Sequence, residues 1–400
     1  MKTASKVIAM ILAAVMLIML VSCEKNNEPS ETSGTDASLE TTDNEQNPEE
    51  NYDGKLVFDH TMELTYAKCF SVDYYKGGYK MITVMDGETV QSKILIVPEN
   101  MSVPSDLEDD VYVLHQPVTN ILVSSTPTTS LFHAIGVLDT ISLTTNDVDS
   151  WYIDEVKALM NEGKMTYIGN YKTPDYDQII VSGSKFAIFS TMLTEDVAEQ
   201  LNKLGVYVML DQAAEEDHPL ARVEWVKLYG AMFNKEAEAE AHFNAQAELI
   251  DKIAEREDTG KSVAIFYITS KGALYARNSD DYMAKMVKLA GGEYVLDGKV
   301  GVGETGTAKM ENEAFYDGAR DADYIIYIWT LGGKPETLDE LLERGDFLQN
   351  MKAVKEGNVW CTSPDFFQIS STLGDMINDI NLMLNADEST EKLTYLFQLK

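Results

Sequence analysis

The stretch NKEAEAEAHFNAQAELIDKIAERED, residues 234–258, contains no proline or glycine and consists mainly of residues with high helix propensity. Some 23 residues of helix would be roughly 35 Å long, which is comparable to the width of a small domain. The helical pattern extends over residues 219–258 as a whole. We therefore expect a helical region whose long helix bridges two lobes.

Strand and helix patterns alternate on both sides of this helical region. Before it, NILVSS (120–125) precedes the helical pattern TPTTSLFHAIG (126–136). After it, SVAIFYIT (262–269) precedes DYMAKMVKLAGG (281–292). Such alternation indicates parallel strands with crossover helices. The predicted fold class is therefore α/β, with two Rossmann-like α/β lobes joined by one long bridging helix.

Composition and pattern divide the chain into five segments. We expect, in chain order, a signal peptide (1–22), a lipidated cysteine with a disordered acidic tether (23–50), an N-terminal α/β lobe (51–218), the helical region (219–258) and a C-terminal α/β lobe (259–400). Residues 55–97 are rich in β-branched and aromatic residues, with hairpin signals at Gly77-Gly78 and Asp86-Gly87. These residues fit the opening strands of the first lobe.

The N-terminus has the plan of a secreted lipoprotein. Lys2 and Lys6 begin it, and residues 7–21 are all apolar. This run is shorter than the roughly 20 residues of a membrane-spanning helix. It ends at LVSC (20–23), which resembles the bacterial lipobox. Cys23 is therefore the expected lipid attachment site on the outer side of the membrane, with an ordinary secreted protein as the alternative.

The formal net charge of −34 excludes broad classes of partner. Nucleic-acid binding needs a basic footprint, and an acidic chain does not lie flat on anionic lipid. Besides Cys23, the cysteines are Cys69 and Cys361, which are too few for a disulfide framework. We interpret both as buried or free thiols, and the sequence leaves a bridge between them open. We expect a monomer.

The sequence gives little support for a catalytic, cofactor-binding or metal-binding motif. GVGETG, residues 301–306, matches G-x-G-x-x-G, but it does not follow the first strand of a βαβ unit, so we interpret it as a mobile glycine-rich loop rather than a nucleotide site. The five histidines occur singly, without metal-ligand spacing. No G-x-S-x-G elbow is present. We predict no catalytic residues, no protein-built metal site and no cofactor.

Two segments have the features of ligand contacts. In SSTPTTS (124–130), Pro127 suits the first position of a helix with Thr126 as its cap, which would present Ser125, Thr126 and free backbone N–H groups to a polar ligand. A plain structural cap is the alternative. In the second lobe, ligands of open α/β sheets bind beyond the carboxyl ends of strands. The predicted contacts there are Tyr267, Lys271, Tyr275 and Arg277, or else solvated loop charges.

The order of these parts resembles that of the substrate-binding lipoproteins of ABC importers for iron–siderophore, haem and cobalamin. The resemblance covers roughly residues 118–360. It rests on TPDYDQIIVSGSKFAIFS (173–190), DHPLARVEWVKLYGAMFNKEAEAEAHFN (217–244), DYMAKMVKLAGGEYVL (281–296) and ENEAFYDGARDADYIIYI (311–328). It implies the class III periplasmic binding protein fold, with a rigid helical hinge and a small closure on binding.

The resemblance also implies a pair of permease-docking residues. In that family, an acidic residue on each lobe docks onto arginines of the permease, and the matching positions here are Asp177 and Glu313. Asp177 departs from the family's usual glutamate by one methylene, and Glu311 competes with Glu313. Charge pairs of this kind mainly set encounter rate and register. Ordinary surface carboxylates are the alternative.

The resemblance implies a non-enzymatic solute-binding protein but does not name its ligand. A ferric siderophore is our first hypothesis, and haem or cobalamin the second. An extracytoplasmic two-domain enzyme is the rival from another class. Aromatic residues near strand ends would stack on a large chelate, and Arg277 or Lys271 would match its negative charge. The aromatic candidates are Trp151, Tyr152, Tyr171, Tyr275 and Trp329. The expected partners are an ABC permease with its ATPase, and the membrane through the lipid anchor.

Overall fold

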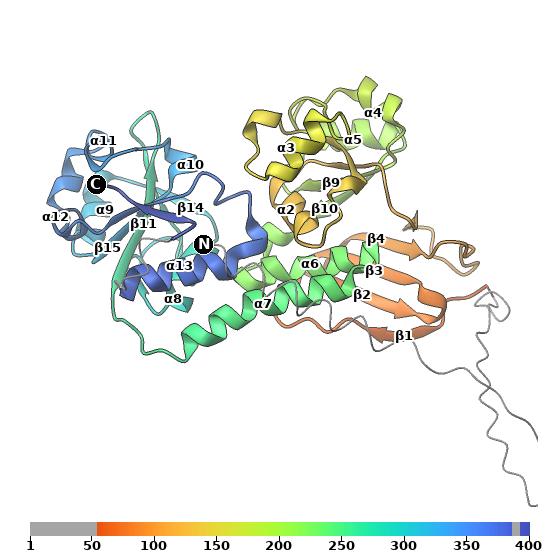
Figure 1. Ribbon diagram of the computed structural model, residues 1–400, viewed down its shortest axis with the longest axis horizontal. Coiled ribbons are helices and arrows are strands. Elements are labelled where there is room, and N and C mark those ends of the chain that lie inside the picture. The colour runs from red at the N-terminus through yellow and green to blue at the C-terminus, as the bar shows by residue number, and fades with distance from the viewer. Residues whose placement is uncertain (1–53, 386–392) are drawn as a thin grey trace, which may run out of the picture. The chain divides into compact units, whose positions relative to one another are not determined.

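The computed structural model describes residues 54–385 and 393–400, which belong to one compact unit. The predicted signal peptide, Cys23 and the acidic tether lie outside the described residues. The described chain forms three β-sheets and a group of central helices (Figure 1). Within these residues, none of the helices combines the length and the apolar character that crossing a membrane requires.

The N-terminal sheet contains five strands in sequential order. They are β1 (Phe58–Thr61), β2 (Phe70–Tyr75), β3 (Lys80–Asp86), β4 (Thr89–Val97) and β5 (Val111–His115). The first four pair antiparallel and β5 pairs parallel with β4. Both predicted hairpins are confirmed: the 3₁₀ turn η2 (Lys76–Gly78) joins β2 to β3, and Gly87 has a φ of 58° between β3 and β4.

These strands do not open the sheet of the first lobe, so that expectation is wrong. They pair only with one another, and their apolar face packs on helix α6 (Pro219–Phe233). The ring centroids of Phe70 on β2 and Trp225 on α6 lie 5.0 Å apart. Burial against a helix, rather than pairing with the next sheet, therefore holds this part of the chain.

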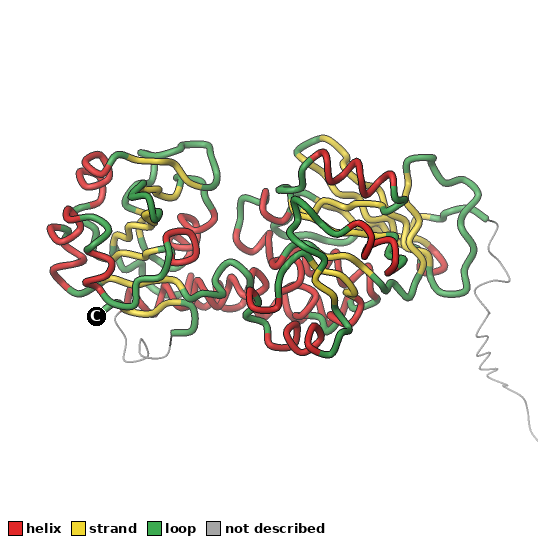
Figure 2. Tube along the Cα trace, turned by 90° about the horizontal axis from the view of Figure 1, so that it is seen from above, coloured by secondary structure: helices red, strands yellow, loops and turns green. Residues whose placement is uncertain are grey.

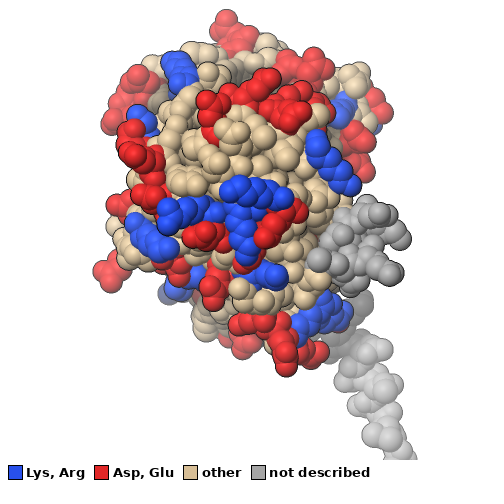
Figure 3. Space-filling view, turned by 90° about the vertical axis from the view of Figure 1, so that its left-hand side faces the viewer, with Lys and Arg blue, Asp and Glu red and all other residues tan. Residues whose placement is uncertain are grey.

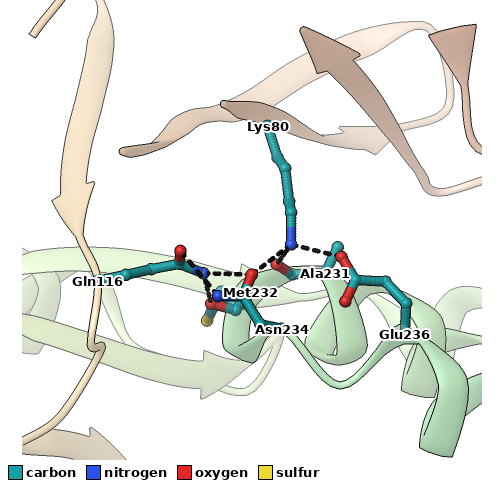
Figure 4. A network of polar contacts seen from close by, with 6 residues as sticks. All are labelled: Lys80, Gln116, Ala231, Met232, Asn234 and Glu236. Atoms are coloured by element: carbon teal, nitrogen blue, oxygen red, sulfur yellow. Dashed lines mark hydrogen bonds and ion pairs between the residues drawn. The ribbon is translucent and has the colours of Figure 1, made fainter. Parts of the chain in front are cut away.

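A polar network ties the same sheet to the end of α6 (Figure 4). Asn234, which follows α6 with a φ of 57°, accepts hydrogen bonds from Lys80 Nζ at 2.7 Å and from Gln116 Nε2 at 2.9 Å. Lys80 also donates to the Ala231 carbonyl at 2.9 Å and pairs with Glu236. Lys80 is buried, so its charge needs these partners.

The first-lobe sheet is parallel, with the strand order β10-β9-β6-β7-β8. Its strands are β6 (Ile121–Val123), β7 (Ile141–Thr144), β8 (Thr166–Tyr167), β9 (Phe186–Ser190) and β10 (Tyr207–Asp211). The helices between them are α2 (Thr126–Ala134), α3 (Asp154–Asn161), α4 (Tyr176–Ser182) and α5 (Glu195–Lys203), with 3₁₀ turns η3 (Leu138–Thr140) and η4 (Val148–Ser150); the 3₁₀ turn η5 (Ala213–Glu215) follows β10. The predicted alternation of parallel strands and crossover helices is confirmed here.

The helical region consists of α6 and the 19-residue helix α7 (Glu236–Ala254), which confirms a long helix within residues 234–258. α7 packs beside α6 and beside α13 (Leu373–Asn385) near the C-terminus. His242 Nε2 lies 2.8 Å from the Ser371 carbonyl oxygen, and Gln246 Nε2 donates to Asp375 Oδ2 at 2.8 Å. The lobes are therefore joined through three packed helices (Figure 1).

The second-lobe sheet is mixed, with the order β14-β12-β11-β15-β16-β17 and β13 paired to β11. Its strands are β11 (Ser262–Ile268), β12 (Leu274–Arg277), β13 (Glu293–Tyr294), β14 (Thr307–Met310), β15 (Tyr324–Tyr327), β16 (Val359–Thr362) and β17 (Leu396–Gln398). Only β11, β13, β15 and β16 pair parallel; β12, β14 and β17 pair antiparallel. The short turn between β11 and β12 explains the direction of β12, because such a turn can only return the chain antiparallel.

Helices lie on both sides of the second-lobe strands (Figure 2). They are α8 (Tyr282–Leu289), α9 (Asn312–Ala319), α10 (Trp329–Gly332), α11 (Leu338–Leu342), α12 (Lys352–Glu356) and α13, with 3₁₀ turns η6 (Asp346–Asn350) and η7 (Ser370–Thr372). This arrangement buries both faces of the sheet, as a doubly covered α/β lobe requires. The boundaries predicted at residues 218 and 258 stay predictions; α6 begins at Pro219 and β11 at Ser262.

Candidate ligand-binding cleft

A cavity of about 520 Å³ lies between the first and second lobes. Residues at or beyond the carboxyl ends of β6, β7, β8, β9 and β10 form its first-lobe wall. Its other wall consists of the end of β12, the start of α8, residues 305–306 and the segment 366–373 that leads into α13. Cavities of roughly 300–1,000 Å³ commonly hold small molecules. The cavity is therefore the candidate ligand site.

The first-lobe wall lies where the strand order of the parallel sheet reverses. The chain runs outward from β6 to β8, and β9 then pairs on the other side of β6. Ser124 directly follows β6 and Ser190 ends β9, and both line the cavity. Crevices of this kind, beyond the carboxyl ends of strands at a switch point, are the usual ligand sites of open α/β sheets.

The start of α2 gives this wall its polar character. Ser125, rather than Thr126, is the N-cap, because its hydroxyl oxygen accepts a hydrogen bond from the Thr128 amide at 3.3 Å. Thr126 is the first helical residue and Pro127 follows it. Ser124 Oγ lies 2.8 Å from Thr145 Oγ1, so a hydrogen bond between these two hydroxyl groups holds the Ser124 side chain beside the N-cap residue. The predicted cap is thus displaced by one residue, and hydroxyl groups remain at the cavity.

Asp211 ends β10 at the base of this wall and is buried. Its Oδ2 accepts hydrogen bonds from the Thr128 and Tyr229 hydroxyls, each at 2.6 Å, and its Oδ1 accepts one from the Ala213 amide at 2.8 Å. Burial raises the pKa of this carboxyl group above its ordinary value, because desolvation disfavours the charged form. Its acceptor atoms are used within the protein.

Arg277 ends β12 on the opposite wall and is 5% exposed. Its Nη1 lies 3.6 Å from Asp281 Oδ2, and its guanidinium carbon lies 5.4 Å from the Phe367 ring centroid. Its Nε and Nη2 have no hydrogen-bond partner among the described residues. A buried cation with two unused donors is rare, because buried polar groups are normally paired.

Arg222 brings a second guanidinium to the cavity from α6. Its carbon lies 4.0 Å from the ring centroid of Tyr282, the first residue of α8, which is within the range of a cation–π contact. Its Nη2 donates to the Ala214 carbonyl at 2.6 Å. Desolvation, with a smaller contribution from the Arg277 charge, lowers the pKa of Arg222 from its ordinary value. Two guanidinium groups therefore face the cavity, close to the carboxylates of Asp281 and Glu215.

The glycine-rich loop at residues 301–306 completes the arginine wall. Thr305 and Gly306 line the cavity. The Asn278 amide donates to the Gly306 carbonyl at 3.0 Å, and the Gly306 amide donates to Asp281 Oδ2 at 3.0 Å. Asn278 Nδ2 also donates to the Thr305 carbonyl at 2.7 Å. These hydrogen bonds restrain a loop that the sequence suggested to be mobile.

The family follows from a comparison of the whole chain with known proteins. Residues 123–365, which include most of the cavity walls, match the sequence profile of the periplasmic binding proteins. The chain belongs to the periplasmic binding protein family. The described N-terminal sheet lies before the matched residues.

Relatives of this periplasmic binding protein include an uncharacterized lipoprotein of Methanocaldococcus jannaschii, 25% identical over 359 residues that span 84% of this chain and 85% of the relative. Among solved structures, a periplasmic binding protein from Veillonella parvula covers 67% of this chain and 92% of its own, with a TM-score of 0.54 and 18% identity.

Two further solved structures share the fold. A periplasmic haem-binding protein from Pseudomonas aeruginosa covers 70% of this chain and 95% of its own, with a TM-score of 0.53 and 14% identity. A protein of an Fe³⁺-hydroxamate transport system from Saccharomonospora viridis covers 67% and 93%, with a TM-score of 0.53 and 16% identity. The class III periplasmic binding protein fold is thereby confirmed.

Four of the ligand contacts predicted from the sequence line the cavity of this periplasmic binding protein: Ser125, Thr126, Tyr171 and Arg277. Trp151 does not line it; its ring is 1% exposed in the core, and its Nε1 donates to the Asn146 carbonyl at 3.4 Å. Tyr152 is 44% exposed and also lies outside the lining. Contact with a ligand stays a prediction for all of them.

The predicted contacts on the β11–β12 hairpin, other than Arg277, do not line the cavity. Tyr267 and Tyr275 stack across the two strands with centroids 5.1 Å apart, and Lys271 is exposed in the turn. Because β12 runs antiparallel to β11, the chain moves away from that turn before it reaches Arg277. Trp329, at the start of α10, contacts Lys334 instead and lies outside the lining.

The two predicted docking residues occupy equivalent positions in the two lobes. Asp177 is the second residue of α4 and Glu313 the second residue of α9, and both are exposed. Glu311, the competing candidate, precedes α9 as its N-cap and is also exposed. Docking to a permease stays a prediction.

Sequence reasoning missed several residues of the cavity. Arg222 lies inside a continuous helical pattern, which gave no sign that one of its faces reaches a cleft. Asp211 could have been suspected, because it follows the apolar strand VYVML directly. Other missed residues include Asn146, Tyr282, Phe366 and Phe367.

Cys69 and Cys361 are free thiols, so the bridge between them that the sequence left open is not formed. Burial raises the pKa of each to about 12. Within residues 54–385 and 393–400, no group of three or more histidine, cysteine, aspartate or glutamate side chains could hold a metal ion.

Proposed function

We propose that this protein is a lipid-anchored solute-binding protein of an ABC importer, and that it captures a ferric siderophore or a similar metal chelate and delivers it unchanged to the permease. The observation that carries the proposal is the cavity between two lobes of a periplasmic binding protein. Hydroxyl groups line one wall, and Arg277 with Phe367 lines the other. A large polar chelate with negative charge suits these walls.

Surface charge agrees with a role in small-molecule capture. Acidic and basic side chains are interspersed on the face shown in Figure 3, and the chain carries a formal net charge of −34. The two guanidinium groups at the cavity contrast with this acidic background. A negatively charged chelate would therefore find its positive partners in the cleft.

Ligand titration of the full-length chain in detergent tests the proposal. Tryptophan fluorescence and calorimetry would follow binding of ferric siderophores, haemin and cobalamin, and chromatography would recover the bound compound. We expect saturable one-to-one binding of one chelate, which is recovered unchanged. Haemin or cobalamin as the bound compound would replace the siderophore in the same role. Conversion of the compound would instead support the enzyme alternative.

Delivery requires a surface that meets the permease, and α4 and α9 are the proposed contacts. Asp177 and Glu313 lie exposed in the first turns of these helices. On α4, Ile180 is 58% exposed and Val181 is 87% exposed, so apolar side chains accompany Asp177. Interfaces combine such apolar contacts with rim charges that set the register.

The proposed anchor is a lipid on Cys23. Replacement of Cys23 with alanine would release the protein from the membrane fraction in the expressing bacterium, because the thiol carries the lipid. The wild-type protein would partition into detergent and show the added mass of the lipid. A wild-type chain that remains soluble and unmodified would contradict the anchor and leave the ligand-binding proposal untouched.

A further inference from the structure

The guanidinium of Arg277 has one edge in use and one edge free. Nη1 faces Asp281 Oδ2 at 3.6 Å, whereas Nε and Nη2 have no partner among the described residues. Nε and Nη2 lie along the same edge of the planar guanidinium group, and an N–H bond of each points in a parallel direction. This edge matches the two oxygens of a carboxylate, which it binds through two parallel hydrogen bonds.

The carboxylates that line the cavity have hydrogen-bond donors other than this edge. Asp281 accepts hydrogen bonds from the amides of Met283 and Gly306, each at 3.0 Å, besides its contact with Nη1. Asp211 accepts hydrogen bonds from the Thr128 and Tyr229 hydroxyls and from the Ala213 amide. Glu215 accepts a hydrogen bond from Thr191 Oγ1 at 3.0 Å. The unused donors of Arg277 therefore need an acceptor from outside the protein.

The surroundings of Arg277 strengthen its interaction with an anion. The side chain is 6% exposed, so water screens its charge little. Arg222 shares the Tyr282 ring with it: the two guanidinium carbons lie 4.0 Å and 5.9 Å from the ring centroid. Two like charges near one ring repel each other, and an anion between them relieves that repulsion.

The first lobe faces the same cavity with donors of its own. The nine-residue helix α2 begins there with Thr126 as its first residue. The Ser125 hydroxyl oxygen is used as an acceptor by the Thr128 amide, so its own proton is free to be donated. A helix N-terminus favours negative charge. Both walls therefore favour an anionic ligand.

We propose that the ligand of this cleft carries a carboxylate group, which Arg277 binds side-on through Nε and Nη2 with Arg222 as the supporting charge. The inference rests on the proposed function, since it specifies the kind of chelate that is captured. It favours a ferric carboxylate chelate or haem, whose propionates are carboxylates, over chelates that carry no carboxylate.

Four probes and matched variants test the inference by calorimetry on the full-length chain. Ferric citrate and haemin carry carboxylates; ferrioxamine B and cyanocobalamin carry none. We expect wild-type protein to bind a carboxylate probe, and Arg277→Gln to weaken that binding about 10- to 100-fold. Arg277→Lys keeps the positive charge but loses the two parallel N–H donors, so this variant should also bind the carboxylate probe weakly. Arg320→Gln, at an exposed arginine outside the cavity, should leave binding unchanged.

Each contrary result has a distinct meaning. Preferential binding of ferrioxamine B or cyanocobalamin, or wild-type affinity for a carboxylate probe in both Arg277 variants, would overturn the inference while the proposed function stands. Equal binding of iron-free and ferric citrate, dependent on Arg277, would support the carboxylate site and contradict chelate capture. Circular dichroism would check that each variant folds. If an Arg277 variant does not fold, Arg222→Gln would take its place, because Arg222 is only partly buried. We expect Arg222→Gln to bind the carboxylate probe more weakly than the wild type does.

Discussion

Tyr229 donates its hydroxyl group to Oδ2 of Asp211 over 2.6 Å, and this hydrogen bond joins the middle of α6 to the end of β10. Thr128 of α2 donates to the same oxygen over the same distance. One buried carboxyl group thus holds three elements together directly beneath the first-lobe wall of the cleft. Buried networks of this kind fix geometry when every member has a partner.

Replacement of Tyr229 with phenylalanine removes one donor from this network without changing the ring. We expect the free energy of unfolding to fall by about 1.5–3 kcal/mol, because a buried carboxyl oxygen loses a hydrogen bond. Urea denaturation would measure the change. Tyr152→Phe, at a tyrosine that is 44% exposed, is the control and should unfold like the wild type. Equal stability of both variants would show that the Asp211 contact contributes nothing.

The pH dependence of stability follows from the raised pKa of Asp211. The folded-state pKa lies above the unfolded value of 3.8, so the folded protein holds this proton more tightly. The contribution of Asp211 to stability is therefore fully present below pH 3.8 and is lost as the pH rises through the folded pKa. In urea titrations, we expect the free energy of unfolding of the wild type, relative to that of Asp211→Asn, to decline as the pH rises from 3.8 through the folded-state pKa of Asp211. A relative stability that rises with pH would contradict the assignment.

Glu224 on α6 provides a second test of a buried carboxylate. Its side chain is fully buried and accepts hydrogen bonds from the amides of Thr65, Tyr66 and Ala67 at 2.7–2.8 Å. Glu224→Gln would point an NH₂ group at some of these donors and should cost about 3 kcal/mol of unfolding free energy.

Hydrogen exchange would locate the effect of this substitution. The amides of residues 65–67 should exchange faster in Glu224→Gln, because they lose their acceptor. Glu248→Gln is the matched control, since Glu248 is 66% exposed and pairs with the exposed Lys252 on α7. Unchanged exchange at residues 65–67 in Glu224→Gln would refute the role of this carboxylate.

The glycine-rich loop allows two glycines to be compared. Gly301 has a φ of 51°, and a Cβ there would overlap the side chain of Asn278. Gly303 has a φ of 81°, but a Cβ there would lie in open space. Gly303→Ala should cost about 1 kcal/mol through backbone strain alone, and Gly301→Ala should cost more because it also displaces Asn278. Thermal unfolding would rank them; equal midpoints would argue against the close approach.

Charge reversal at the proposed docking residues should separate delivery from capture. Asp177→Lys and Glu313→Lys should leave ligand affinity unchanged and reduce uptake by about tenfold or more, because each places a lysine opposite the permease arginines. Uptake of radiolabelled chelate into cells that lack the wild-type protein would measure this. Asp196→Lys and Asp339→Lys are matched controls, being exposed second residues of α5 and α11. Equal uptake in all four variants would exclude docking through α4 and α9.

Local patterns were sufficient to predict the lobes. The helix α7 lacks proline and glycine, and the first-lobe strands are short apolar runs before helical patterns, so propensity and burial agree. The prediction that the N-terminal strands open the sheet of the first lobe is wrong. A hairpin pattern specifies only which neighbouring strands pair, and not the surface on which the resulting sheet packs. Its packing partner, α6, lies more than 100 residues further along the chain.

The cleft was predicted less well than the fold, for a similar reason. Ser125 and Arg277 were found because strand ends in α/β sheets are expected at ligand sites. Tyr267 and Tyr275 satisfied the same expectation but stack on each other, which depends on the antiparallel course of β12. Arg222 comes from a helix whose pattern shows no exposed face.

Asn234 has a consequence for how the molecule unfolds. Its side-chain oxygen accepts hydrogen bonds from Lys80 in the N-terminal sheet and from Gln116 beyond it, while its backbone ends α6. The sheet cannot detach without breaking the hydrogen bonds and the ion pair of Lys80 and without stripping the apolar cover from α6. We therefore expect the N-terminal sheet not to fold on its own but to melt cooperatively with the helices that join the lobes.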